Sequence, residues 1–391
     1  MGARQGVAGT DRPVTPTGAT RPVRVASWPH WYGPNPYLAL LYRALEPHGV
    51  EHVRDVPLDP GAFAGPDGAA DVLHLHWAYP LWRESARRGT SRSRRIRDAL
   101  ERLERIRAHG VALVWTVHNV VPHDGLRRGE AEAYAWLHEL ADLRVFHTES
   151  ARAEATARYG RGRGDTILQH HGNWDGATPV PLPRAAVLIR EELPDEPRML
   201  LCFGQVRAYK GFDLAVETAR TLDPEAYHLV VAGRAIDGEG RRLSRLARGA
   251  RNVTRILEEI DDQRLADLLG AADAVLLPYR SVTGSGALLH ALTVGRGVIA
   301  TDLPFFREIL GQEPDAGVLV PDAGPEALAA GVREFFAVET GSRGRAARRL
   351  ADRFAWPDVV RPLAAWLRQE GRRRTRPQNP GGEEAGLGRT A

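Results

Sequence analysis

The sequence has 391 residues, of which 43% are hydrophobic, and a formal net charge of +4. A chain of this length can bury two ordinary hydrophobic cores, so two domains are expected. The small positive charge favours anionic small ligands or an acidic membrane face. The arginines are spread over many helical segments without interleaved exposed aromatics, so nucleic-acid binding is not expected.

A single cysteine, Cys202, excludes a disulfide framework and indicates a reducing compartment, so a cytoplasmic protein is expected. No apolar run approaches the length of a membrane span, and the N-terminal segment lacks the apolar core of a signal peptide. Residues 1–22 are predicted to be a disordered leader and residues 371–391 a disordered basic tail. The tail is interpreted as a solvated end, with weak contact to anionic lipid at the inner membrane face as the less favoured alternative.

In the first half, short apolar runs alternate with segments of helical periodicity, which indicates a parallel sheet with right-handed crossovers. One helix is expected to have Asn35 as its N-cap and Pro36 at its first position, and to end at Gly49. The other helices are predicted at 93–109, 129–140 and 149–159, and the strands at 23–28, 71–77, 111–117, 143–147 and 166–169.

Residues 175–183 contain three prolines and no periodicity, as expected of a linker between domains. A second alternating series follows, with strands predicted at 198–203, 228–232, 252–257, 273–277, 297–300 and 317–320 and helices near 211–222, 241–248, 261–270 and 286–294. The predicted fold class is α/β, with two Rossmann-like domains, at 23–178 and 179–350, facing across a cleft. A last helix within residues 351–370 is expected to pack back on the first domain.

The loop after the strand 198–203 holds Lys210, the single lysine among 53 basic residues. A single lysine in an arginine-rich sequence could be there by chance, but its sequence context favours a role in binding an anionic ligand. Lys210 follows Gly204 and Arg207, and Gly211 and a helix come next. A strand, a glycine-bearing loop with two cations and a helix N-terminus are where α/β proteins bind phosphate.

A second loop with the sequence TGSG, residues 283–286, follows the strand 273–277 and precedes a helix. Small residues let backbone N–H groups approach an anion, and the helix N-terminus adds partial positive charge. Two tight turns without a ligand remain the alternative. Because a diphosphate needs several converging donors, the two loops together favour a diphosphate site formed by Gly204, Gly284, Ser285 and Gly286.

Two long stretches, FGQVRAYKGFDLAVETA (203–219) and AADAVLLPYRSVTGSGALLHALTVGRGVIATDLPFFREIL (271–310), resemble the donor-binding half of GT-B glycosyltransferases of the large retaining family GT4, glycosyltransferase group 1. In the first half, TVHNVVPHDG (116–125) and QHHGNW (169–174) are similar to loops of bacterial members that build surface polysaccharides or glycosylate small molecules. The resemblance implies transfer of a hexosyl unit from a nucleoside-diphosphate sugar to a hydroxyl of a glycan, a lipid-linked glycan or a small molecule. It further implies retention of configuration, with no metal and no cofactor.

The sequence departs from the family pattern at the donor site. Two glutamates that the family carries eight residues apart correspond to Val282 and His290, and an arginine after the loop glycine corresponds to Gln205. We expect Arg207 to supply the missing charge and His290 to make one hydrogen bond to the nucleotide ribose. Glu308 is a candidate to orient donor hydroxyls, with a carboxylate at a helix N-terminus as the equal alternative.

Of the fourteen histidines, His118 is the main candidate for a residue of the functional site. It ends the strand 111–117 and is followed by Asn119, at the sheet edge where ligand groups gather in open α/β folds. The resemblance implies a role beside the donor sugar or the reacting centre, with a structural histidine as the alternative. His74 and His76 are interpreted as facing opposite sides of the sheet. Loop histidines at 123, 170 and 171 lack metal-ligand spacing, and a zinc site is not expected.

The acceptor is expected to enter from the first half, near Tyr32, Gly33, Asn35 and Trp77. Aromatic rings there are expected to stack on sugar faces, with a core position for Trp28, Trp31 and Trp77 as the alternative. The catalytic candidates are Lys210, Arg207 and His118, with fixed cations and backbone N–H groups stabilising the leaving diphosphate. A nucleotide-sugar epimerase would need an acidic pair that is not seen, and a non-catalytic sugar-nucleotide-binding relative is favoured only by the missing glutamates. The donor sugar, the base and the acceptor stay open.

Overall fold

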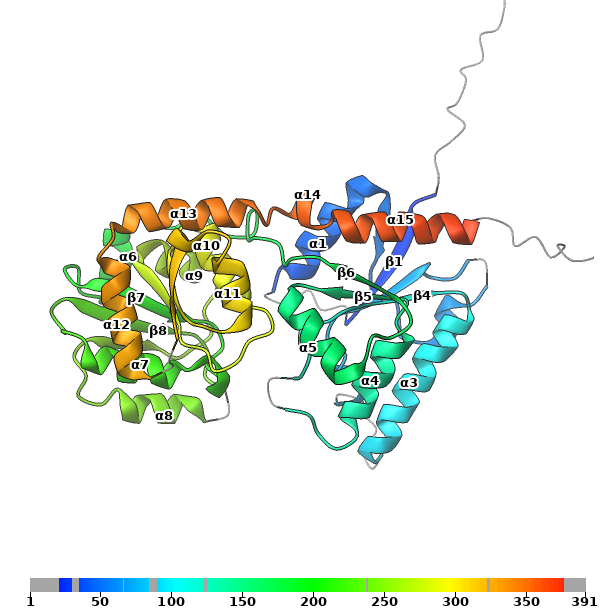
Figure 1. The fold of residues 1–391 in the computed structure, drawn as a ribbon, viewed down its shortest axis with the longest axis horizontal. Helices are drawn as coiled ribbons and strands as arrows, with labels where there is room; N and C mark the ends of the chain where they lie inside the picture. The colour runs from blue at the N-terminus through cyan, green and yellow to red at the C-terminus, as the bar shows by residue number, and fades with distance from the viewer. Residues whose placement is uncertain are drawn as a thin grey trace, which may run out of the picture.

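A computed structural model describes residues 21–29, 35–65, 67–83, 90–122, 125–236, 238–321 and 324–375. Within these residues the chain forms two lobes, each built on a parallel six-stranded sheet flanked by helices, as Figure 1 shows. The α/β fold with two Rossmann-like halves is therefore confirmed. Residues 1–20 and 376–391, which carry most of the predicted disorder, lie outside the described part of the chain.

The sheet of the N-terminal lobe has the strand order β2-β1-β3-β4-β5-β6. The inner strands β3, β4 and β5 are buried along their whole length, which explains why they read as continuous apolar runs. The strands are β1 (Val23–Trp28), β2 (Val50–Val53), β3 (Val72–Leu75), β4 (Ala112–Thr116), β5 (Leu143–Phe146) and β6 (Asp165–Leu168). The helices are α1 (Tyr37–Leu45), α2 (Pro80–Arg83), α3 (Arg92–Ala108), α4 (Glu130–Leu140) and α5 (Glu149–Tyr159).

The sheet of the C-terminal lobe has the strand order β12-β11-β10-β7-β8-β9. Its strands are β7 (Arg198–Phe203), β8 (Tyr227–Ala232), β9 (Val253–Ile256), β10 (Ala274–Leu277), β11 (Val298–Thr301) and β12 (Gly317–Val320). The helices are α6 (Arg184–Arg190), α7 (Phe212–Thr221), α8 (Glu239–Leu246), α9 (Asp262–Ala271), α10 (Gly286–Thr293), α11 (Pro304–Leu310), α12 (Pro325–Phe336) and α13 (Thr340–Asp352).

Each sheet reverses its direction of strand addition at one point. In the C-terminal lobe β7 lies between β8 and β10, and in the N-terminal lobe β1 lies between β2 and β3. In open parallel sheets the loops that leave the carboxyl ends of two such neighbouring strands diverge, which creates the usual ligand position. The predicted phosphate loops follow β7 and β10, and the predicted acceptor residues follow β1 and β3.

The C-terminal helices connect the lobes a second time. Figure 1 shows α13, α14 (Trp356–Val359) and α15 (Arg361–Thr375) running along one side of both lobes. α14 packs against α1, and α15 contacts β1, β2 and β6, so the predicted return of the last helix to the first half is confirmed. The indole of Trp366 fixes α15 there by donating from Nε1 to Asp165 Oδ2 at 2.7 Å.

Three local predictions were wrong. Pro36, rather than Asn35, is the N-cap of α1, although the Asn35 side chain still accepts from the Tyr37 backbone N–H at 3.1 Å. α15 continues to Thr375, past the predicted start of the disordered tail at Gly371. The extension is packed, because a Cβ at Gly371 would lie 2.5 Å from Val23 Cγ2.

The third error concerns His74 and His76, which lie on the same side of the sheet. Residues two apart in a strand share a face, and both imidazoles contact the hydroxyl of Tyr42. None of the described helices combines the length and apolarity that crossing a bilayer requires.

Candidate functional site

The loop after β7 has a backbone that only glycine allows at two points. Gly204 has a φ of 99° and Gly211 a φ of 66°, both in the region that side chains disfavour. A Cβ at Gly211 would lie 1.9 Å from the carbonyl oxygen of Pro278, in the loop after β10. The two predicted phosphate loops are therefore in direct backbone contact.

Arg280 fastens the two loops further. Its backbone N–H donates to the carbonyl of Tyr209 at 2.7 Å, and its guanidinium donates to the carbonyl of Ala208 at 2.8 Å. The same guanidinium makes two hydrogen bonds with the buried carboxylate of Asp213 in α7, at 2.7 and 2.8 Å. Arg280 thus holds the loop that carries Lys210 against the loop after β10.

The ammonium of Lys210 lies inside this loop pair. A Cβ at Gly204 would approach Nζ to 2.8 Å, and Nζ lies 5.7 Å from the centre of the Tyr279 ring. Burial and the neighbouring Arg207 guanidinium lower the pKa of Lys210 to about 8. Nζ has no hydrogen-bond or ion-pair partner among the described residues, so this partly buried cation has no counter-ion in that part of the chain.

Arg207 stands beside Lys210 at the start of the same turn. Its Nε donates to Oε1 of Gln205 at 3.1 Å, so the residue that replaces the family arginine orients the one expected to take its place. Arg207 is partly exposed. The pair presents two positive charges at the carboxyl edge of β7.

The loop after β10 ends in a capped helix N-terminus. Ser285 is the N-cap of α10, and its Oγ accepts from the Leu288 backbone N–H at 3.2 Å. Gly286 is the first residue of the helix. The Ser285 side chain accepts from Leu288, so the N–H groups of Gly286 and Ala287, which have no partner within the helix, can point at an anion.

The two lobes approach each other at this turn. A Cβ at Gly284 would lie 4.0 Å from the backbone carbonyl oxygen of His118, which follows β4 in the N-terminal lobe. Asn119 is the next residue and is partly exposed. The structure therefore brings the predicted His118 and Asn119 next to the predicted glycine loop.

A row of buried imidazoles holds the His118 ring. His118 Nδ1 lies 3.4 Å from His147 Nε2, and His118 Nε2 lies 3.2 Å from His76 Nδ1. His147 Nδ1 lies 2.8 Å from the carbonyl oxygen of Gln169. Burial lowers the pKa of His118 and of His76 well below the usual value and that of His147 to about 3, so all three are neutral at pH 7.

The Gln169 carbonyl sets the direction of this row. A carbonyl only accepts, so His147 Nδ1 carries the proton and His147 Nε2 is an acceptor. His118 Nδ1 then donates to His147, and His118 Nε2 accepts from His76 Nδ1. The imidazole of His118 is thereby a fixed tautomer with both ring nitrogens engaged.

Aromatic rings cover the remaining faces of His118. Trp77 stacks on it with ring centres 4.4 Å apart, and Tyr37 meets it edge-on at 4.9 Å. Trp77, predicted on the acceptor side, therefore lies beside the reacting-centre candidate. Asn35 lies in the loop after β1, while Tyr32 and Gly33, like His123, fall outside the described residues.

Two predicted donor residues have partners in the chain. His290 is buried against residues 173–183, with its Nε2 3.0 Å from Thr178 Oγ1. This segment extends the predicted linker by two residues and is called the linker below. The carboxylate of Glu308 accepts from the backbone N–H groups of Glu149 at 2.7 Å and Ser150 at 3.0 Å. Glu308 thus takes the second of its two predicted roles, a carboxylate at a helix N-terminus, and the helix is α5 of the other lobe.

Comparison with known proteins identifies the fold and the reaction class. Residues 197–337 match the family described as glycosyl transferases group 1. The chain is 29% identical over 274 residues to a GDP-mannose:glycolipid 4-beta-D-mannosyltransferase of Xanthomonas campestris pv. campestris, covering 68% of this chain and 69% of that one. A D-inositol 3-phosphate glycosyltransferase of Xylanimonas cellulosilytica is 30% identical over 206 residues, 50% of this chain and 49% of the relative.

Solved structures, one of them of a named glycosyltransferase, share the arrangement of the two lobes. Anabaena HepE in complex with UDP-glucose superposes with a TM-score of 0.67 at 14% identity, covering 89% of this chain and all of that one. WaaG, involved in lipopolysaccharide biosynthesis, gives 0.62 at 14% identity, covering 88% and 99%. The chain is a glycosyltransferase with the GT-B fold, and its residues 197–337 match the group 1 family.

Several residues that shape the site of this glycosyltransferase escaped the sequence analysis. His147 belongs to the row of imidazoles, and the Tyr42 hydroxyl contacts His74 beside it. Trp174 packs on α10, the helix that follows the glycine loop. Only the alternation LHLH in β3 and the cluster of histidines at the ends of β4, β5 and β6 gave a signal for the row. Trp174 gave none, because its partners in α10 lie more than a hundred residues away.

Proposed function

We propose that this glycosyltransferase transfers a hexosyl unit from a nucleoside-diphosphate sugar, with Lys210, Arg207 and the backbone N–H groups of residues 284–286 binding the diphosphate. One observation carries the proposal. Lys210, a partly buried ammonium without a counter-ion among the described residues, lies at the carboxyl edge of β7, where the strand order reverses toward β10. An uncompensated cation in that position is stabilised by an anionic ligand.

The chemistry follows from the charge that develops on the leaving group. As the glycosidic bond breaks, negative charge grows on the terminal phosphate, and donors already aimed at that phosphate stabilise the transition state. Lys210 and Arg207 supply full charges, and the first turn of α10 supplies N–H groups and the helix dipole. His118, held neutral, faces the glycine turn from the N-terminal lobe and is proposed to contact the sugar through its edge or its backbone carbonyl.

We propose that the acceptor binds on the N-terminal lobe, at the loops after β1 and β3 that include Asn35 and Trp77. The relatives named above are a mannosyltransferase that acts on a glycolipid and an inositol 3-phosphate glycosyltransferase, which supports a glycan, lipid-linked glycan or small-molecule hydroxyl as acceptor. We propose a guanosine or uridine diphosphate sugar as donor, because one relative uses GDP-mannose and one structural neighbour binds UDP-glucose. Contact with a membrane surface would be peripheral.

Retention of configuration remains a prediction. It needs no protein base, because the leaving phosphate can assist the incoming hydroxyl on the same face of the sugar. The Xanthomonas relative is named for a β-mannosyl product, so the anomeric outcome of this chain has to be measured. A time course of the product by proton NMR with an α-linked donor decides it, since a β-glycoside would overturn retention.

The experiment that tests the function is donor hydrolysis and transfer by the wild type and Lys210→Ala. Thermal-shift screening with GDP, UDP, dTDP and their sugars first identifies the donor, because a ligand that binds only the native state raises the melting temperature. Loss of the cation should lower transfer about 100-fold or more, as removal of one transition-state donor does in other enzymes. Unchanged turnover by a folded Lys210→Ala protein would remove Lys210 from the mechanism.

A further inference from the structure

Trp174, in the linker, makes three separate contacts with α10. Its indole Nε1 donates to the carbonyl oxygen of Gly286 at 3.0 Å, and its backbone N–H donates to Oγ1 of Thr293 at 3.0 Å. Its ring stacks on His290 with ring centres 4.3 Å apart and an angle of 6° between the planes. These contacts reach the first, middle and last residues of α10, so one linker residue spans the whole helix.

The stacked pair is itself fixed. His290 is 4% exposed, and burial lowers its pKa to about 4, so the ring is neutral and stacks without a charge to solvate. Thr178 Oγ1 lies 3.0 Å from His290 Nε2 and 3.2 Å from the carbonyl oxygen of Trp174. His290, at the position of the ribose-binding glutamate of the family that the sequence resembles, therefore binds the linker in this chain.

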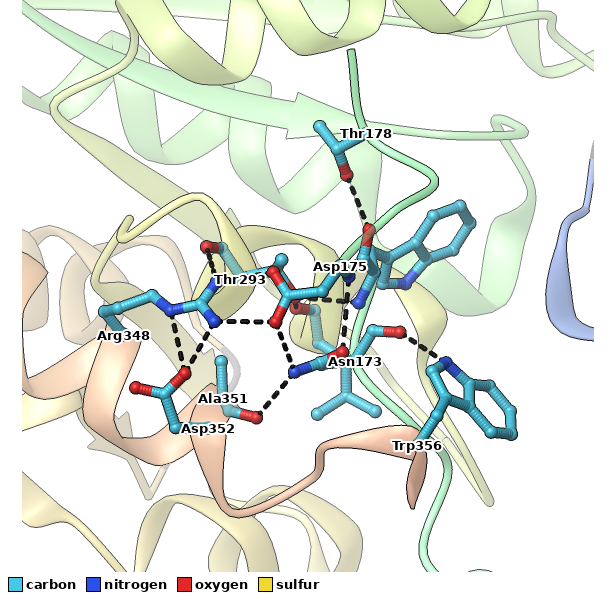
Figure 2. A network of polar contacts seen from close by, with 10 residues as sticks. Asn173, Asp175, Thr178, Thr293, Arg348, Ala351, Asp352 and Trp356 are labelled. Atoms are coloured by element: carbon cyan, nitrogen blue, oxygen red, sulfur yellow. Dashed lines mark hydrogen bonds and ion pairs between the residues drawn. The ribbon is translucent and has the colours of Figure 1, made fainter. Parts of the chain in front are cut away.

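The other side of the linker is held as firmly, as Figure 2 shows. The Asn173 backbone N–H donates to the carbonyl of Phe354 at 2.8 Å, and its Nδ2 donates to the carbonyl of Ala351 at 3.1 Å. Asp175 forms a two-pronged ion pair with Arg348, at 2.6 and 2.8 Å. Trp174 thus projects from a segment that is fixed immediately before and after it.

The hydrogen bond to Gly286 has a consequence for the anion site. The Gly286 carbonyl and the Ala287 N–H belong to one planar trans peptide unit and point in opposite directions. A donor that fixes the carbonyl therefore also fixes the direction of that N–H, which points toward the N-terminal end of α10. The indole also covers Gly286 closely, since a Cβ there would lie 3.4 Å from Trp174 Cζ2.

We propose that Trp174 is a positioning residue for the diphosphate: by holding the Gly286 peptide and the length of α10, it aims the helix N-terminal N–H groups at the phosphates. This inference rests on the proposed function, because it assumes that a diphosphate binds at the first turn of α10. Trp174 acts through the helix and touches no substrate itself.

The test compares Trp174→Phe with Trp366→Phe. The first variant keeps a stacking ring and loses the N–H donor to Gly286. The second loses an equivalent Nε1 donor, to Asp165, on α15 in the N-terminal lobe. Calorimetric titration with GDP, UDP and dTDP should show about five-fold weaker binding for Trp174→Phe, as expected for one lost hydrogen bond, and wild-type binding for Trp366→Phe. Both should lower the melting temperature by similar amounts.

Fluorescence gives a second readout that a merely structural role would not move. Diphosphate binding should change the tryptophan emission of the wild type and of Trp366→Phe, and the change should be absent in Trp174→Phe. Thr178→Val, which loosens His290 without altering the indole, provides a milder variant with an expected affinity loss of about two-fold. Wild-type affinity in both Trp174→Phe and Thr178→Val would overturn the inference. Failure of the wild type to bind any of the three nucleotides would instead overturn the diphosphate site itself.

Discussion

A Cβ atom added at Gly204 would lie 2.8 Å from the ammonium nitrogen of Lys210. A side chain at Gly204 would therefore crowd the ammonium of Lys210 and displace it from its present position. Two loops that contact each other through Gly211 and Pro278 complete the surroundings of the ammonium. The first prediction tests this relationship directly.

Gly204→Ala should displace the ammonium and lower transfer at least about ten-fold, a loss of about 1.4 kcal/mol in transition-state stabilisation. The backbone conformation also disfavours alanine, because φ of Gly204 is 99° and an alanine in that region lowers the free energy of unfolding by about 1–2 kcal/mol. Steady-state kinetics and a thermal melt separate the two effects.

Gly49→Ala is the matched control for Gly204→Ala. Gly49 has a φ of 78°, and an added Cβ would meet nothing within 4 Å. It should cost similar stability and leave transfer unchanged. Equal losses of transfer in both variants would mean that Gly204 matters for folding only.

The second prediction concerns alkaline pH. The pKa of Lys210 is lowered to about 8 by burial, so the ammonium of the free enzyme loses its charge as pH rises through 8. Burial raises the pKa of Tyr209 to about 12 and also that of Tyr279 and Cys202, so these neighbours do not titrate in that range. The kcat/KM for the donor should therefore fall above pH 8, measured in a constant-ionic-strength buffer series.

Lys210→Arg and Lys210→Met sharpen this second prediction. A guanidinium stays charged, so the arginine variant should be slower than the wild type but show no decline from pH 8 to 9.5. The native pKa of Lys210 lies below that of the unfolded chain, so the charge opposes folding at pH 7. Lys210→Met should raise the melting temperature by about 2 °C while abolishing diphosphate binding. A melting temperature of Lys210→Met below that of the wild type would contradict the view that the Lys210 ammonium is an uncompensated charge.

The third prediction concerns acid stability. Burial lowers the pKa of His74 and of His147 to about 3 and that of His118 well below the usual value, whereas the unfolded chain titrates near 6.5. The unfolded state binds more protons between those values, so the free energy of unfolding should fall as pH falls from about 6.5 to 4. Each such histidine contributes up to about 1.4 kcal/mol per pH unit.

His74→Leu should flatten this pH dependence, although it removes one of the imidazole contacts of Tyr42 and the imidazole partner of Thr116 and so lowers stability at pH 7. His109→Gln, at an exposed position after α3, should leave the slope unchanged. Urea unfolding at intervals of half a pH unit measures both slopes. Parallel curves for His74→Leu and the wild type would show that His74 is not neutral in the native state.

The fourth prediction concerns the contact between the lobes at Glu308. Its carboxylate accepts two backbone N–H groups at the start of α5, 2.7 and 3.0 Å away, and this interaction adds to the Thr148 cap of the same helix. Glu308→Ala should therefore speed amide hydrogen exchange at residues 149 and 150 about ten-fold.

Glu313→Ala serves as the comparison for Glu308→Ala, because Glu313 pairs with Arg349 and Arg353 at the end of α13 and not with α5. Exchange at the start of α5 should be unchanged in that variant. If Glu308→Ala also leaves the two amides protected, the lobes do not depend on this carboxylate for their contact.

Most strands and the position of the two predicted phosphate loops followed from local sequence, whereas helices α11, α12 and α13 were not predicted. Strand β7 and the loop with Lys210 were predictable because a buried apolar run, two glycines and two cations lie within a few residues. Strand β2 was missed because it is an edge strand of four residues with a single buried side chain, Val50. The short helix α6 was missed because it directly follows the prolines of the linker.

Partners in the site could not be predicted where they depend on distant contacts. Glu308 was expected either to orient donor hydroxyls or to lie at a helix N-terminus, and its partners at the start of α5 lie 158 and 159 positions earlier. His290 was expected at the ribose, yet its ring is stacked on Trp174, whose indole bonds a carbonyl 112 positions away. No local periodicity encodes such pairs, because they arise only when two separately folded sheets are brought together.

The chain passes between the lobes twice, once through the linker and once where α13 gives way to α14. Asn173 and Trp356 bond these two passages to each other, since the Trp356 indole donates to the Asn173 carbonyl at 2.8 Å. The two connections therefore form one junction, and a rotation of the lobes about this junction also has to break the contact of Glu308 with α5. Substrate entry and product exit are therefore expected to share a single angular movement of whole lobes.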